Sequence, residues 1–420
     1  MVTSWQADYP QEYQEIIAKT DDKVRPIFSK LDSIALNNQS KVLKSFQKHH
    51  VSDFHFQAST GYGYHDEGRE TLESIYADVF NTEDALVRPQ IISGTHAITV
   101  ALFGNLLPGD ELLYVSGEPY DTLQEVIGFA GDHVGSMMSY GITVNYVPLT
   151  EDGKFDGPAI KDALKRHPKI VAIQRSKGYA SRDSFTIREI KDLVTIIKEG
   201  SPSSIVFVDN CYGEFIEEKE PTDIGVDLIA GSLIKNAGGG LAKIGGYIAG
   251  KSEYIKASAT RLYAPGIGKN AGATVIGLRD FYQGFFMAPH VAIQALKSSI
   301  FAAALLDHFD IETHPKWDAP RTDIIQTVYL SSREAMITFA KTIQKYSPVD
   351  SNVIPEPADM AGYENQIIMA GGSFVEGATI ELSTDGPIRP PFSMYLQGGL
   401  TFEHAKLAYT AAVYDLFYNK

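Results

Sequence analysis

The chain has 420 residues, and its 37 Lys plus Arg against 52 Asp plus Glu give a formal net charge of −15. Hydrophobic residues make up 44% and charged residues 21%, which is typical of globular proteins and excludes a disordered chain, a collagen-like repeat or a small disulfide scaffold. The acidic balance argues against nucleic acid and anionic membranes as partners, because their phosphates repel such a surface. A single cysteine, Cys211, permits no intramolecular disulfide. With no secretory signal and no apolar run long enough to span a bilayer, we expect a cytoplasmic protein.

The N-terminal residues 1–55 read as a helical arm. Apolar residues recur there at helical spacing from Ile16 to Phe46, and Pro26 predicts a break. The pattern has no feature of a separate core, so we expect an outer helical layer.

From about residue 85, short apolar runs alternate with helical stretches. The runs are LVRPQIIS, ELLYVSG, ITVNYVPL, KIVAIQ, SIVFVDN and GGYIAG, and residues 160–164 and 187–197 are typical of the intervening helices. Such alternation predicts an α/β fold with a mostly parallel sheet covered on both faces. We assign this large domain to residues 56–288.

The rhythm changes again near residue 290. Helical patterns cover residues 291–309 and 324–346, two short strands follow at IIMA and TIELS, and a last helix covers about 402–417. The sequence therefore predicts a smaller α+β domain at residues 289–420.

The strongest chemical signal is an acid and a lysine at the ends of two neighbouring predicted strands. Asp209 ends VFVD, and Lys235 follows LIAGSLI. In a parallel sheet both side chains emerge at the carboxyl edge, where ligands bind. A lysine there can form a Schiff base with an aldehyde cofactor, and the acid can hold a pyridinium nitrogen protonated. The alternative from these two residues alone is a salt bridge at the sheet rim.

Two further segments carry weaker signals. Ser93, Gly94 and Thr95 open an apolar helix, whose free N–H groups suit a phosphate, although an ordinary helix cap explains the same residues. Tyr120 follows the strand ELLYVSG, where an aromatic ring can stack on a planar cofactor or simply fill the core.

The order of these features resembles the fold type I pyridoxal-phosphate (PLP) enzymes, whose large domain is aspartate aminotransferase-like. The strings GSLIKNAGGGLA, RLYAPGIGK, STDGPIRPP and YLQGGLTFEH are similar to the cystathionine γ-synthase and methionine γ-lyase group, and most to its aluminium-resistance or methionine γ-lyase-like branch, with cystathionine β-lyase-type activity. The resemblance covers nearly the whole chain.

The resemblance implies roles for the residues of the predicted site. Lys235 would hold PLP as an internal aldimine, Asp209 would pair with the pyridine nitrogen, and Tyr120 would stack on the ring. The turn of Ser93, Gly94 and Thr95, together with Ser232, would hold the phosphate.

Other residues are implied at the edges of the site. Tyr62 or Tyr64 would reach the phosphate of the neighbouring subunit, with Arg69 as a further candidate for that contact. The expected assembly is therefore a homodimer or homotetramer. Arg389 would bind the substrate α-carboxylate, for which a bidentate arginine is well suited. Arg175, at another strand end, is a second substrate-binding candidate.

The implied activity is β- or γ-elimination of a thiolate from a sulfur-containing amino acid. Racemisation and aldol cleavage use the same residues, and PLP binding for storage or regulation is an alternative from another class. A nucleotide bound at the turn from Gly94 to His96 is a third. No metal site is expected, because the four histidines between His49 and His65 lack the spacing of zinc ligands.

Overall fold

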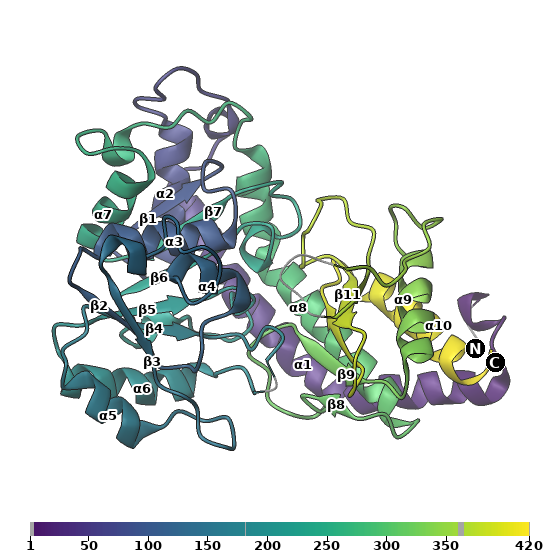
Figure 1. Cartoon of the computed structure of the whole chain (residues 1–420). Helices are drawn as coiled ribbons and strands as arrows, with labels where there is room; N and C mark the ends of the chain where they lie inside the picture. The colour runs from purple at the N-terminus through teal and green to yellow at the C-terminus, as the bar shows by residue number, and fades with distance from the viewer. Residues whose placement is uncertain (1–3, 181, 360–364, 420) are drawn as a thin grey trace. The chain divides into compact units, whose positions relative to one another are not determined.

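The computed structural model describes residues 4–180, 182–359 and 365–419, and the chain divides into two compact units (Figure 1). One unit is Asn37–Pro289, and the other combines Met1–Leu36 with His290–Lys420. The expected boundary at 288/289 lies next to this division. The first 36 residues group with the C-terminal part of the chain and have no compact unit of their own.

Helix α1 (Gln11–Lys48) continues through Pro26, so the predicted break is wrong. Pro26 is exposed, while Tyr13, Ile17 and Val42 on either side are fully buried. Packing along both halves of the helix therefore outweighs the cost of about 3 kcal/mol that an interior proline imposes.

The larger unit contains a seven-stranded sheet in the order β1-β7-β6-β5-β4-β2-β3. Strands β2 to β6 are parallel to their neighbours, and only β7 runs against β6 and β1, so the mostly parallel sheet is confirmed. The strands are β1 (Asp84–Arg88), β2 (Glu111–Tyr114), β3 (Thr143–Tyr146), β4 (Ile170–Gln174), β5 (Ile205–Asp209), β6 (Leu228–Ser232) and β7 (Gly246–Gly250).

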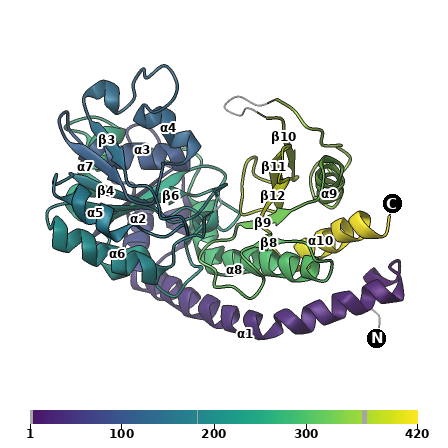
Figure 2. The ribbon, with the colours of Figure 1, turned by 60° about the horizontal axis from the view of Figure 1, so that its bottom comes forward.

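Helices cover both faces of this sheet, as Figures 1 and 2 show. One face carries α3 (Gly94–Asn105), α4 (Asp121–Ile127) and α7 (Ser252–Leu262), and the opposite face carries α5 (Gly157–Leu164) and α6 (Ile187–Gly200). Helix α2 (Glu67–Val79) packs along β1. Alternate strand residues pack against α3 in a shared core, among them Leu112, Ile170, Phe207 and Leu228.

The smaller unit contains a five-stranded antiparallel sheet in the order β10-β11-β12-β9-β8. Its strands are β8 (Thr313–His314), β9 (Gln326–Tyr329), β10 (Ile367–Ala370), β11 (Ser383–Pro387) and β12 (Ser393–Gln397). Helices α9 (Arg333–Lys345) and α10 (Phe402–Phe417), together with the C-terminal part of α8 (Arg279–Asp307), complete its core.

Two expectations for the smaller unit are corrected. The helix expected over residues 324–346 begins only at Arg333, because the β-branched run before it pairs with β12 as strand β9. The strand expected at TIELS, residues 379–383, begins only at the last of these residues and runs over Ser383–Pro387 as β11.

Helix α8 is the one described helix long and apolar enough to cross a membrane by length and composition. Its apolar window is 83% buried inside the protein. That burial is typical of a core helix, so the finding gives only weak evidence for a membrane span.

Candidate functional site

The structure brings Asp209 and Lys235 to the same edge of the large sheet. Asp209 ends β5 beside Ala230 of the parallel neighbour β6, and Lys235 follows three residues after β6 ends at Ser232. The Asp209 carboxylate accepts a hydrogen bond of 3.1 Å from the N–H of Cys211. Both side chains remain partly exposed, so a ligand at this edge can reach them.

The two charges influence each other. Burial raises the pKa of the Asp209 carboxyl, and the Lys235 charge and the Cys211 N–H offset part of that rise. For Lys235, burial lowers the pKa of the amine, but Cys211, Tyr212 and Asp209 favour the charged form and bring the net pKa above its ordinary value. The lysine therefore carries a proton when nothing is attached to it.

The first turn of α3 lies against this pair. A β-carbon on Gly94 would stand 3.1 Å from the Ser232 Cβ and 3.3 Å from the Cys211 Sγ, so only glycine fits without displacing a neighbour. The Ser232 hydroxyl is buried and has no hydrogen-bond partner in the described part of the chain. A buried donor without an acceptor is costly, and the free N–H groups of the helix start lie next to it.

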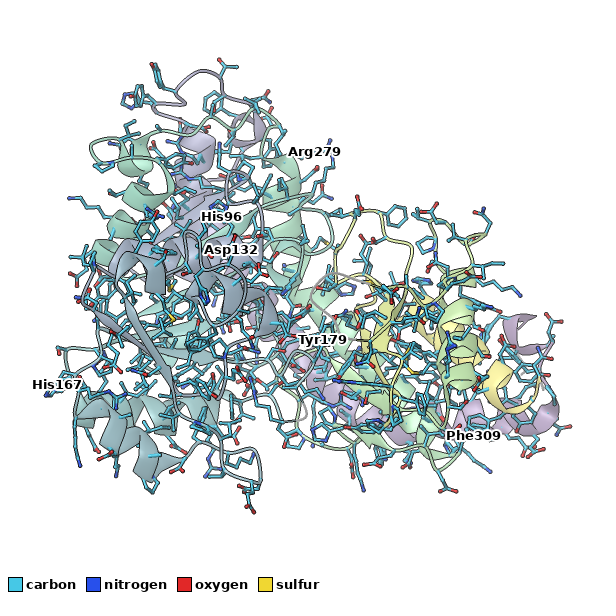
Figure 3. The ribbon with its side chains drawn as sticks, in the orientation of Figure 1. His96, Asp132, His167, Tyr179, Arg279 and Phe309 are labelled. Atoms are coloured by element: carbon cyan, nitrogen blue, oxygen red, sulfur yellow. The ribbon has the colours of Figure 1, made fainter. Side chains whose placement is uncertain are left out.

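The other two residues of this turn have partners already. The Ser93 hydroxyl accepts a hydrogen bond of 3.0 Å from the N–H of His96, labelled in Figure 3, and so caps α3. The Thr95 and Thr122 hydroxyls lie 3.2 Å apart, which ties the starts of α3 and α4 together. Their predicted contribution to a phosphate site therefore rests on the backbone at this turn.

Tyr120 lies at the start of α4 and close enough to Lys235 to raise the pKa of its amine. Its ring packs on Gly178, where a β-carbon would approach within 3.0 Å of the Tyr120 Cε2. Tyr179, labelled in Figure 3, presents a second ring at a centroid distance of 6.2 Å. The Tyr120 ring at the start of α4 thus packs against the loop after β4 that carries Gly178 and Tyr179.

Arg175 is fully buried and its guanidinium is occupied by protein acceptors. It donates to Asn210 Oδ1 at 2.8 Å, to the Gly213 carbonyl at 3.0 Å and to Glu217 Oε1 at 3.1 Å. In this geometry Arg175 braces the loop after β5, and substrate binding by it stays a prediction.

Tyr62 and Tyr64 lie on an exposed loop before α2. Their side chains are 73% and 55% exposed, and their rings stack at a centroid distance of 5.4 Å. Arg69 is buried beneath them and donates to the carbonyls of Gly63 at 2.7 Å and Gly272 at 2.9 Å. Arg69 therefore holds the tyrosine loop in shape.

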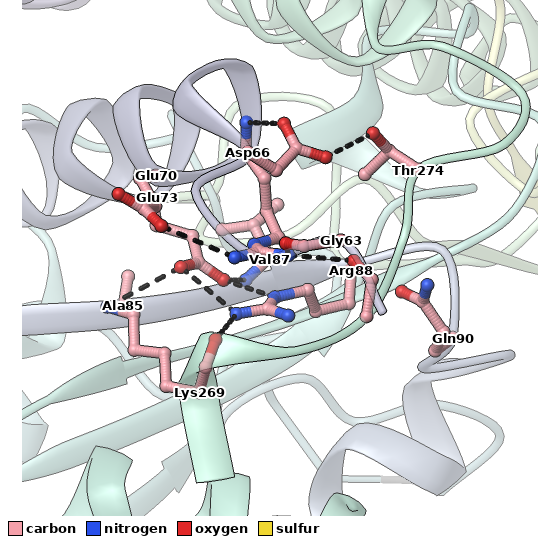
Figure 4. A network of polar contacts seen from close by, with 12 residues as sticks. Gly63, Asp66, Glu70, Glu73, Ala85, Val87, Arg88, Gln90, Lys269 and Thr274 are labelled. Carbon is pink, nitrogen blue, oxygen red and sulfur yellow. Dashed lines mark hydrogen bonds and ion pairs between the residues drawn. The ribbon is translucent and has the colours of Figure 1, made fainter. Parts of the chain in front are cut away.

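Figure 4 shows the polar network that continues from this anchor. The Asp66 carboxylate accepts hydrogen bonds from the Arg69 N–H at 2.9 Å and the Thr274 hydroxyl at 2.6 Å. The buried pair of Glu73 and Arg88 lies next to it. The loop is thus fixed from two segments that lie about 200 residues apart in sequence.

Arg389 lies in the smaller unit, exposed on the connection between β11 and β12. Its backbone N–H donates to the Pro387 carbonyl at 2.8 Å, and its carbonyl accepts from the Phe392 N–H at 2.7 Å. The tight turn holds the backbone, while the side chain remains accessible for its predicted role.

Three neighbours of the site carry no motif that reveals them in the sequence. The Tyr212 ring lies 4.1 Å from the Lys235 Nζ, and the Asn236 amide donates to the loop that carries this ring. Glu214 is fully buried and accepts a hydrogen bond of 2.8 Å from the Tyr247 hydroxyl. Burial raises the pKa of Glu214 to about 8. Only their closeness to Asp209 in VDNCYGEF or to Lys235 in SLIKN was visible beforehand.

Across residues 4–180, 182–359 and 365–419, no group of three or more His, Cys, Asp and Glu side chains could hold a metal ion. His49 instead contacts Asp78 at 2.7 Å.

Comparisons with known proteins identify the family of the chain. The family profile described as methionine gamma-lyase matches residues 13–417. The uncharacterized protein YnbB of Bacillus subtilis is 55% identical over 96% of this chain and 97% of its own length. A solved structure from Clostridium novyi, described as a carbon-sulfur lyase involved in aluminum resistance, is 46% identical with a TM-score of 0.94, over 98% of this chain and 99% of that one. A Bacillus cereus structure is 54% identical with a TM-score of 0.95, over 96% and 99%.

More distant structures share the fold alone. A cystathionine gamma synthase from Xanthomonas oryzae is 15% identical with a TM-score of 0.57. The family implies PLP as cofactor, and the residues present fit it: a primary amine at Lys235, an acid at Asp209, and the orphan Ser232 hydroxyl beside a helix start at Gly94. The match over residues 13–417 and this arrangement show that the chain belongs to the methionine gamma-lyase family of α/β, fold type I PLP-dependent enzymes.

Proposed function

We propose that the protein is a PLP-dependent carbon–sulfur lyase that acts on a sulfur-containing amino acid by β- or γ-elimination. The observation that carries the proposal is the placement of Asp209 at the end of β5 and of Lys235 just after the parallel strand β6, beside the Ser232 hydroxyl, which has no partner among the described residues, and the glycine turn at Gly94. The family and a relative described as a carbon-sulfur lyase support it.

Each residue has a task that its position permits. The Ser232 hydroxyl and the backbone N–H groups of Gly94 and Thr95 would hold the phosphate, and the Tyr120 ring would pack on the cofactor ring. The Asp209 carboxylate would keep a proton on the pyridine nitrogen. Bound PLP would supply an electron sink for the charge left at the substrate α-carbon.

Lys235 and Arg389 would act on the substrate. When the substrate amine displaces Lys235 as an uncharged amine, Lys235 would be placed to take the α-proton as a general base. Arg389 would hold the α-carboxylate through two hydrogen bonds. The carbon–sulfur bond would then break, and the electron pair would leave with the thiolate. Hydrolysis of the unsaturated amine that remains would yield a keto acid and ammonia.

The first test is the visible absorption of the purified protein before and after borohydride reduction. We expect an absorption band that bleaches, with the reduced cofactor mapped to Lys235 by peptide mass spectrometry. Lys235→Ala should lose the band and all turnover. Lys243→Ala is the matched control, since Lys243 is 73% exposed and paired with Asp280 on the surface. A colourless wild-type protein that stays colourless after PLP is added would overturn the proposal.

The second test separates lyase activity from other PLP functions. A coloured protein should release thiol, keto acid and ammonia in equal amounts from cystathionine or methionine. Colour with racemised or aldol-cleaved amino acid would instead identify a different reaction on the same residues. Colour without turnover on any amino acid would favour storage or regulation.

The same proposal includes a cytoplasmic homo-oligomer with shared sites. The two tyrosines at 62 and 64 are exposed on a loop that is anchored from below, which suits contact with a second subunit. Whether two dimers pair is a question for light scattering on the intact protein.

A further inference from the structure

The catalytic lysine is in contact with a ring outside the roles assigned above. The Lys235 Nζ lies 4.1 Å from the centroid of the Tyr212 ring. This is well within the distance at which an ammonium is attracted to the negative face of an aromatic ring. Tyr212 follows Asp209 by three residues and is only partly exposed.

The backbone of Tyr212 is held in an unusual conformation. Its φ is +71°, in the left-handed region that side chains with a β-carbon rarely adopt. Such a conformation persists only where the surroundings enforce it, and it is found most often at functional sites.

The enforcing group is Asn236, the residue next to the lysine. Its fully buried amide nitrogen donates to the carbonyl of Tyr212 at 2.9 Å and to that of Glu214 at 3.0 Å. The amide therefore connects the turn that carries the lysine to the turn that carries the ring. The distance between Nζ and the ring is thus set by both backbones.

We propose that the Tyr212 ring is a docking surface for the Lys235 amine when that amine is not bound to cofactor, and that Asn236 positions the ring for this purpose. The inference rests on the proposed function, because it takes Lys235 as the cofactor lysine. Tyr212 is then a catalytic residue, since it touches the reacting nitrogen, and Asn236 is a positioning residue.

The docking has a consequence for the proton that Lys235 carries. When Nζ takes a proton from the substrate α-carbon, the ring faces the ammonium that forms and stabilises it, and no covalent bond changes at the ring. Cys211, Tyr212 and Asp209 together raise the pKa of the amine against the effect of burial. Removing the ring therefore lowers the pKa of the amine and increases its uncharged fraction at any given pH.

The experiment measures the reactivity of Lys235 in the full-length chain freed of cofactor. Trace acetylation with acetic anhydride between pH 6 and 11, read by peptide mass spectrometry, gives the titration curve of this one amine. The exposed Lys243 in the same sample is the internal reference. The variants are Tyr212→Leu, which removes the ring, and Tyr212→Phe, which keeps it without the hydroxyl.

In Tyr212→Leu we expect the Lys235 titration curve to move down by about 0.5–1.5 pH units, so that labelling at pH 8 rises about 3–30-fold. Tyr212→Phe should stay within about threefold of wild type. An unchanged curve in Tyr212→Leu overturns the proposal. Equal shifts in both variants also overturn it, because the hydroxyl and not the ring would then hold the amine.

Two additions keep the result decisive. If Tyr212→Leu does not fold, Tyr212→Gly removes the ring and relieves the left-handed backbone, and the same shift is expected. Asn236→Ala should shift the curve in the same direction, and an unchanged curve there refutes its positioning role. A wild-type chain that never binds PLP would contradict the proposed function. Because acetylation needs no cofactor, the labelling rates of Lys235 in wild type, Tyr212→Leu and Tyr212→Phe would still decide the role of Tyr212.

Discussion

At the scale of single residues, the proposed phosphate site depends on the absence of a side chain at Gly94 and on the unpaired hydroxyl of Ser232. Gly94 has no side chain, which lets the start of α3 lie against Ser232 and Cys211, and the Ser232 hydroxyl has no acceptor among the described residues. The unpaired hydroxyl is unfavourable in an empty protein and favourable in one that holds an anion, since the anion would accept its hydrogen bond. The identity of these two residues was visible in the sequence, but their contact was not, because 138 residues separate them.

Gly94→Ala should weaken cofactor binding by about tenfold or more, equivalent to about 1.4 kcal/mol. The added methyl group would lie 3.1 Å from the Ser232 Cβ and displace either the hydroxyl or the helix start. PLP titration followed by absorbance gives the dissociation constant. Gly157→Ala, whose nearest neighbour would be at 3.9 Å, is the control. Equal affinities for wild type and Gly94→Ala would contradict the phosphate site.

The buried carboxyl of Glu214 makes the free energy of unfolding depend on pH. Burial raises the pKa of this carboxyl to about 8 in the folded protein, against about 4.3 in an unfolded chain. The folded state thus holds a proton that the unfolded state has lost, so stability falls as the pH rises from about 4.5 to about 8. In Glu214→Gln the Tm should fall about 2–5 °C less than in wild type between pH 5.5 and 8. As a control, Glu199→Gln at an exposed position should lose as much Tm as wild type between pH 5.5 and 8. If Glu214→Gln also loses as much as wild type, Glu214 is already ionised in the folded protein and the prediction is wrong.

At the scale of elements, local patterns located the strands of the large sheet and left their pairing open. The runs ending at Gln174 and Asp209 were recognised from composition, and α10 matches the predicted helix 402–417. The antiparallel direction of β7 has no local signature, because direction is decided by the connection and not by the strand. The same limit applies to Tyr212, whose left-handed backbone accepts a hydrogen bond from Asn236 in a different element.

The contact between α2 and β1 depends on the buried ion pair of Glu73 and Arg88. Glu73 accepts from Arg88 Nε at 2.5 Å and from the Val87 N–H at 3.1 Å. Glu73→Ala leaves the guanidinium buried without its counter-ion, so the free energy of unfolding should fall by about 3–5 kcal/mol in urea titrations. Asp162→Ala removes an exposed pair with Lys165 and should change little. A loss for Glu73→Ala no larger than that of this control would show that the pair is not needed.

At the scale of the whole molecule, the proposed sharing of active sites between subunits predicts complementation between two inactive chains. Lys235→Ala lacks the lysine, and the double variant Tyr62→Phe, Tyr64→Phe lacks both hydroxyls that would reach a neighbouring phosphate. Differently tagged chains co-purified as mixed oligomers should regain about half of the wild-type activity per dimer, because one site then receives every group. Mixed oligomers no more active than the two pure variants would refute sharing.

Helix α1 imposes an order on how the chain is completed during synthesis. Its first half is synthesised long before its partners near residue 410: the Tyr13 hydroxyl donates to the Thr410 carbonyl at 2.7 Å, and Asp21 pairs with Lys406. The larger unit, residues 37–289, can leave the ribosome and fold while the apolar side of residues 11–36 is still without its core. Until α10 emerges, that amphipathic segment is available to chaperones and to other nascent chains, so a ribosome stalled within residues 290–400 presents residues 11–36 unprotected and prone to association.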